Sequence, residues 1–101
     1  MLNSLASEIH QTALNHGFWE SENKAEKIAL MHSELSEALE AIRKPCQDDK
    51  CPAYTGEEVE LADAVIRILD YAHHFGLDLE GAISAKAAFN KTRPYKHGKA
   101  F

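Results

Sequence analysis

Residues 57–75 constrain the fold most, because the helix that they predict is apolar on nearly every side. At about 100° per residue, the apolar residues cover most of the helical circumference. The polar residues are confined to one narrow stripe: Glu60, Asp63, Arg67, Asp70 and His74. A helix with this pattern is normally buried, and a short chain can bury every side of it only against a partner subunit. Because buried carboxylates are costly without a cation, the stretch predicts both self-association and a bound cation.

The preceding helical stretch, residues 24–43, carries a matching pair of acids. Glu34 and Glu37 are three residues apart and therefore share a helix face. Antiparallel packing against residues 57–75 would bring them to Glu60 and Asp63, and four close carboxylates need a metal to neutralise them. Oxygen ligands without His or Cys select Mg²⁺, with Mn²⁺ as a substitute. The alternative is that these acids are solvated surface residues, with Arg67 paired to Asp63 and Asp70 at helical spacing.

Helical periodicity and capping signals predict an all-α fold. Thr55 with Glu58 has the pattern of a capping box, and Pro45 ends the helix before it. We expect one domain over residues 1–101, a four-helix bundle-like arrangement that ends in a basic tail at about 91–101. The predicted helices span about 4–16, 24–43, 57–75 and 78–90.

Charge and composition exclude several classes of partner. The net charge of −5 argues against nucleic-acid or membrane binding. All 16 acids lie within residues 1–80, whereas residues 81–101 carry five basic residues and no acid. The N-terminal sequence lacks the pattern of a signal peptide, so a cytoplasmic location is expected. Cys46 and Cys51 fit free thiols in that compartment better than a zinc site or a disulfide.

Three segments of the chain together resemble a known family. They are IALMHSELSEALE at 28–40, ELADAVIRILD at 60–70 and KAAFNKTRPYKHGK at 86–99. The chain resembles the all-α nucleotide pyrophosphohydrolases of the MazG type, especially their short single-domain members. The resemblance implies Mg²⁺-dependent hydrolysis of a (deoxy)nucleoside triphosphate to the monophosphate and pyrophosphate, as in housecleaning of the nucleotide pool. It also implies a homodimer or a homotetramer.

The resemblance further implies which residues form the site. The family's metal-binding acids match Glu34, Glu37, Glu60 and Asp63, and its polar positions on the triphosphate side match Lys86, Asn90 and Arg93. One of the four acids, not saturated by metal, could accept the proton of the attacking water. Glu37 is the candidate, and Glu34 is the other acid with an expected catalytic role. Trp19 is a candidate for stacking on a nucleobase, although a tryptophan in such a connector more commonly covers the core.

Two other readings of the acids remain open. Di-iron carboxylate bundles use Glu-x-x-His pairs, and the nearest match here is the single Asp70–His73 spacing. A non-enzymatic helical oligomerisation or regulatory module would instead leave the four acids exposed and distant from one another: Glu34, Glu37, Glu60 and Asp63.

Overall fold

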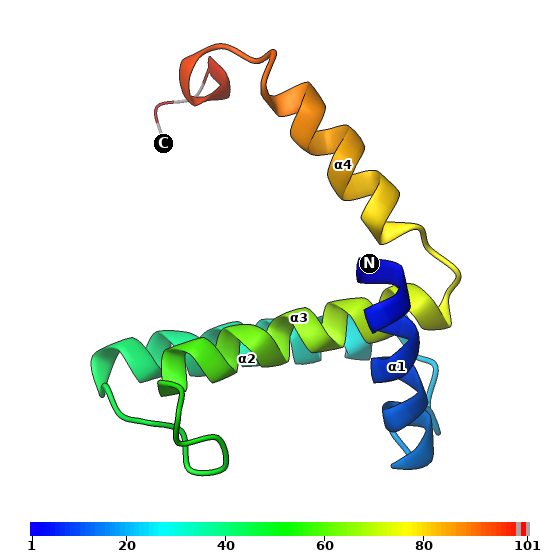
Figure 1. The fold of residues 1–101 in the computed structure, drawn as a ribbon, viewed down its shortest axis with the longest axis vertical. Coiled ribbons are helices and arrows are strands. Elements are labelled where there is room, and N and C mark those ends of the chain that lie inside the picture. Colours follow the sequence, from blue (N-terminus) through cyan, green and yellow to red (C-terminus); the bar gives the residue numbers. More distant parts are fainter. Residues whose placement is uncertain (99, 101) are drawn as a thin grey trace.

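Four α-helices make up the regular structure in the computed structural model, which describes residues 1–98 and 100 (Figure 1). They are α1 (Leu2–Asn15), α2 (Lys24–Arg43), α3 (Gly56–His74) and α4 (Leu79–Asn90), followed by a short 3-10 helix, Tyr95–Gly98. The described residues contain no named strand, only an isolated bridge between Gln47 and Thr55. The predicted four-helix all-α fold is confirmed. Lys99 and Phe101 of the predicted basic tail lie outside the described residues.

Side-chain caps fix where three of the helices begin. The Asn23 side chain accepts a hydrogen bond from the Glu26 amide at the start of α2. Thr55 and Glu58 form the reciprocal capping box of α3, as their spacing predicts. Asp78 accepts from the amide of Gly81 in α4. Because α1 has no such side-chain cap, no sequence signal marked its start, and it begins two residues earlier than predicted.

Helix α3 lies between α2 and α1 and contacts both. Helices α2 and α3 are antiparallel, since Arg67 bonds to Glu34 along their length and Gly56 approaches Ala41 at one end. Helix α1 is tied to α3 where His10 meets Asp70. The buried hydrophobic residues are mostly small, which lets the helices approach closely: Ala6, Ala38, Ala64, Leu69 and Ala72.

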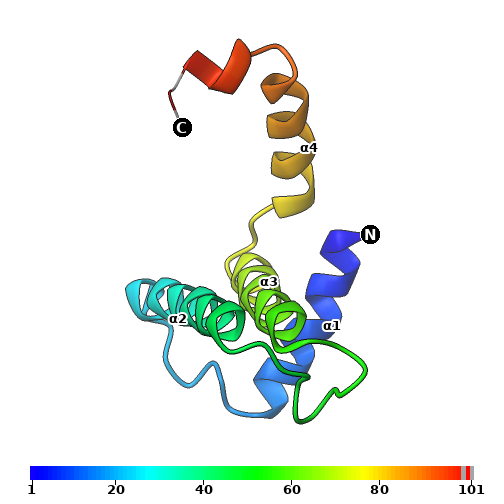
Figure 2. The same cartoon turned by 90° about the vertical axis from the view of Figure 1, so that its left-hand side faces the viewer.

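Helix α4 extends away from the other three (Figures 1 and 2). It has no buried residue. Hydrogen bonds join its first turn to the start of α1. The side-chain amide of Asn3 donates to Asp78, and the ammonium group of Met1 donates to Glu80. The radius of gyration, 15.9 Å, exceeds the ~13 Å expected of a compact chain of about 100 residues. Helices α1 to α3 therefore form the body of the protein, and α4 is an arm.

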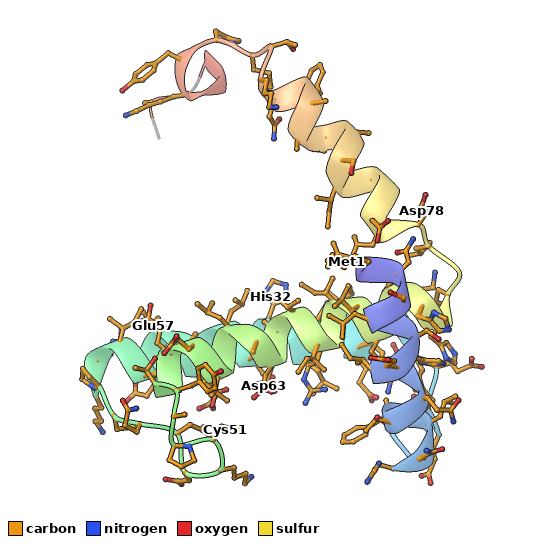
Figure 3. All side chains as sticks on the ribbon, in the orientation of Figure 1. Met1, His32, Cys51, Glu57, Asp63 and Asp78 are labelled. Atoms are coloured by element: carbon orange, nitrogen blue, oxygen red, sulfur yellow. The ribbon has the colours of Figure 1, made fainter. Side chains whose placement is uncertain are left out.

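The α2–α3 layer has two chemically different faces. Asp63 lies on the side opposite to His32 and Glu57 (Figure 3). Helical spacing places the apolar side chains that are 37–55 % exposed on the same face as His32 and Glu57: Leu35, Leu39 and Ile42 on α2, and Leu61, Val65 and Ile68 on α3. We call this the apolar face. No helix in the described part of the chain is both long and apolar enough to span a membrane.

Candidate metal centre and adjoining cavity

Three of the four predicted metal-binding acids converge between α2 and α3. One carboxylate oxygen from each of Glu34, Glu60 and Asp63 lies within 4.8 Å of the others, and all three residues are half-buried. We call them the acidic triad. The i, i+3 spacing of Glu60 and Asp63 puts both on one face of α3, and the antiparallel packing brings Glu34 of α2 to them. A set of oxygen ligands only is chemically suited to a hard divalent cation.

The surroundings of the triad disfavour full ionisation. Burial raises the pKa of Glu60, and its hydrogen bond with Glu34 and the repulsion from nearby carboxylates raise that pKa further. Burial, followed by the charge of Glu34, raises the pKa of Asp63, while Arg67 acts in the opposite direction. The triad therefore holds more negative charge than the protein alone comfortably accommodates, as expected of a site that binds a cation.

Glu37, the fourth predicted acid, lies outside the triad. It is exposed, and it acts on Glu60 only through charge repulsion. It is therefore near the triad without being part of it. A carboxylate so placed is free to accept a proton instead of binding a metal.

Arg67 is a residue of the site that the sequence interpretation did not identify. Its Nε donates to Oε1 of Glu34 at 3.0 Å, and both side chains are largely shielded, at 32 % and 15 % exposure. Helical spacing makes Asp63 and Asp70 of the same helix the alternative partners of Arg67, whereas the observed bond joins α3 to α2. Its place in the polar stripe of α3 was the available signal.

A cavity of about 380 Å³ runs from the triad to the connector between α1 and α2. Glu34, Asp63 and Arg67 line it together with Phe18 and Trp19. Lys27, Asp70 and Tyr71 add further polar groups to its wall. The cavity thus joins carboxylates to aromatic rings and two basic side chains.

Trp19 is held in the cavity wall by Asp70. The Trp19 Nε1 group donates to both oxygens of Asp70 at 3.0 Å. Nδ1 of the buried His10 lies 2.7 Å from Oδ1 of the same carboxylate. Asp70 therefore ties α1 and the connector to α3. Neither His10 nor Asp70 was predicted, although Asp70 also belongs to the polar stripe of α3.

Both faces of the Trp19 ring are covered. The His74 ring stacks on it with centroids 3.7 Å apart and planes 2° from parallel. The Lys27 ammonium nitrogen lies 4.5 Å from the Trp19 centroid, and with His74 on one face it has room only over the other. A nucleobase could stack on Trp19 only after Lys27 moves.

The three residues predicted on the triphosphate side lie on or beyond α4, away from the cavity. Lys86 and Arg93 lie over the ring of Phe89, 5.0 and 5.7 Å from its centroid. Asn90 Oδ1 is buried and, among the described residues, has no hydrogen-bond partner. None of the three lines the cavity. Within one chain the structure therefore does not bring them to the triad.

The loop between α2 and α3 approaches the triad. The charges of Asp48 and Lys50 both act on Asp63. The loop is closed by the Gln47–Thr55 bridge. Cys46 and Cys51 are exposed free thiols, as the sequence predicts.

No family model, curated protein or solved structure matches this chain.

The raised pKa of Glu60 predicts a pH-dependent effect of Glu60→Gln on stability. The folded chain binds a proton on Glu60 more tightly than the unfolded chain does. Protonation of Glu60 therefore contributes favourably to stability, and this contribution is complete below the usual pKa of 4.5. It is lost as pH rises through the raised value. At pH 7 without metal, we expect Glu60→Gln to raise the melting temperature by a few degrees, and below pH 4 to leave it unchanged. Thermal unfolding followed by circular dichroism measures both. An equal effect of the exposed control Glu57→Gln would contradict this explanation.

Proposed function

We propose that this protein is a Mg²⁺-dependent nucleoside triphosphate pyrophosphohydrolase of the MazG type. The observation that carries the proposal is the convergence of Glu34, Glu60 and Asp63 beside a cavity with an aromatic wall, which Glu34 and Asp63 line. A non-enzymatic module would leave such acids apart and solvated. Their half-burial favours a role that needs their charge.

The dimensions and chemistry of the cavity fit a nucleotide. Its volume of about 380 Å³ is within the range of small-molecule sites. The triad would hold Mg²⁺ beside the phosphates, while Lys27 and Arg67 supply positive charge along the wall. Phe18 and Trp19 would contact the base, with Trp19 becoming available once Lys27 leaves its face. Mn²⁺ would substitute for Mg²⁺, since both accept oxygen ligands.

The proposed reaction needs few groups of the protein. Water attacks the α-phosphorus, the bond to the bridging oxygen breaks, and pyrophosphate leaves with the electron pair. Bound Mg²⁺ would supply positive charge that neutralises the carboxylates and phosphate oxygens. Glu37, beside the triad but outside it, is our candidate to accept the proton of the attacking water. Positioning and charge neutralisation provide the remaining rate enhancement.

The test is pyrophosphate release from a panel of ribo-, deoxyribo- and modified nucleoside triphosphates, with Mg²⁺ and with a chelator. We expect metal-dependent pyrophosphate and the monophosphate, with little free phosphate. Absence of pyrophosphate across the whole panel would contradict the proposal. The ranking of substrates would show which base and sugar the cavity prefers.

We further propose that the working form is a homodimer or a homotetramer. The apolar face leaves six large apolar side chains at least 37 % exposed, and a second copy packing its own α2 and α3 there would cover them. Helix α4 extends on the same side of the layer (Figure 1). Association would therefore place a neighbouring copy near Lys86, Asn90 and Arg93.

Sedimentation at micromolar concentration is expected to show no monomer for the natural sequence. Leu39→Glu should shift the protein to monomer, because it places a charge at the centre of the apolar face. The control Leu14→Glu changes a leucine of α1 with a similar exposed fraction, 44 % for Leu14 against 51 % for Leu39. This control should leave the oligomer intact. A clean monomer of the natural chain would contradict this interpretation.

A further inference from the structure

Arg67 forms an ion pair with one member of the triad, Glu34. Of the basic side chains in the described part of the chain, it alone forms an ion pair with a triad carboxylate. The partner, Glu34, also influences the pKa of both Glu60 and Asp63. The guanidinium group is therefore bonded to the central member of the triad.

A divalent cation at the triad and Arg67 would both bind the carboxylate of Glu34. Each would take lone pairs of the same carboxylate, and two positive charges at such short range repel strongly. The part-buried position of the pair reduces screening by solvent. We therefore expect cation binding at the triad to weaken the bond between Arg67 and Glu34.

The cavity provides a second place for the guanidinium group. Arg67 already lines the cavity beside Asp63 and Glu34, so a phosphate held in the cavity would lie near its guanidinium group. Guanidinium groups bind phosphate oxygens with paired hydrogen bonds. The same residue can thus leave a carboxylate and bind a phosphate without movement of α3.

We propose that Arg67 is a built-in counter-cation, which pairs with Glu34 while no metal is bound and is displaced by the divalent cation to bind a phosphate of the substrate. This inference rests on the proposed function, because it concerns the same site. Arg67 would couple the two ligands: the metal frees the group that the nucleotide needs.

The first test measures cation binding alone, by calorimetric titration with Mn²⁺ or Mg²⁺ and no nucleotide. Arg67→Met removes the competitor and should tighten cation binding roughly tenfold. Arg67→Lys keeps the charge and should stay close to the natural chain. The control Arg43→Met removes a charge whose exposed ion pair is with Glu40, and should have little effect. Circular dichroism of each variant verifies the fold.

The second test measures binding of a triphosphate with a non-hydrolysable α–β bridge at saturating Mg²⁺. Arg67→Met should weaken this binding roughly tenfold, because a charge-assisted hydrogen bond to phosphate is lost. Arg67→Met is thus expected to raise the affinity for the cation and to lower the affinity for the triphosphate. A residue that only maintained the fold would weaken both.

If Arg67→Met binds the cation no more tightly than the natural chain does, the proposed displacement of Arg67 by the cation is wrong. This holds even if the natural chain binds metal and hydrolyses nucleotides. Unchanged nucleotide affinity in the variant would equally overturn the phosphate role. If the natural chain binds neither cation, the proposed function falls as well. The failures of the two proposals are therefore distinguishable.

Discussion

Asp63→Asn is expected to lower Mg²⁺-dependent pyrophosphate release by a factor on the order of 10³, since electrostatic stabilisation at the reacting phosphate is lost. The variant keeps the size of the side chain but removes one of the three charges that converge within 4.8 Å. Cation affinity should fall with activity. Initial rates and calorimetric titration of the same preparations measure the two effects.

Two further variants separate a metal ligand from a proton acceptor. Glu37→Gln should also abolish hydrolysis, but with the fold intact and cation binding largely retained, because Glu37 is outside the triad. The control Glu40→Gln removes an exposed carboxylate of α2 and should change neither quantity. Full activity in Glu37→Gln would disprove the role assigned to that residue.

Leu69→Ala is expected to have the largest effect on stability. Leu69 is 2 % exposed, and the other buried hydrophobic residues in the described part of the chain are all alanines. Truncating a buried leucine typically costs about 2–5 kcal/mol, a large share of the ~5–15 kcal/mol that stabilises a domain. Chemical denaturation should show a much lower midpoint or no folded baseline.

Leu14→Ala is the matched control for this loss. Leu14 lies on α1 and is 44 % exposed, so its truncation should cost less than about 1 kcal/mol. Equal losses in the two variants would mean that the buried α1–α3 core does not dominate stability.

Local signals made most of the helix boundaries predictable. Asn23 and Thr55 cap helices whose starts agree with prediction to within one residue. The position of α4 could not be predicted in this way, since caps and periodicity describe a helix but not what it packs against. The apolar pattern of α3 predicted burial on nearly every side, yet Leu61 and Val65 are about half exposed in the single chain.

The candidate site was predictable only where spacing along a helix determined it. The i, i+3 relation of Glu60 and Asp63 was sufficient to place them together. Spacing could not decide which acid of α2 would face them, and the packing brings Glu34 to them but leaves Glu37 outside. The pairing of Arg67 depends on contacts between helices, which no local pattern encodes.

The covered ring of Trp19 has a practical consequence. It is the only tryptophan in the chain, its Nε1 group is bonded to Asp70, and it lies against His74 at the wall of the cavity. Imidazole, ammonium and carboxylate groups at such distances strongly affect indole emission. Any molecule that displaces Lys27 from the ring therefore changes the intrinsic fluorescence of the protein, and occupation of the cavity can be followed in solution without a label or a substrate that turns over.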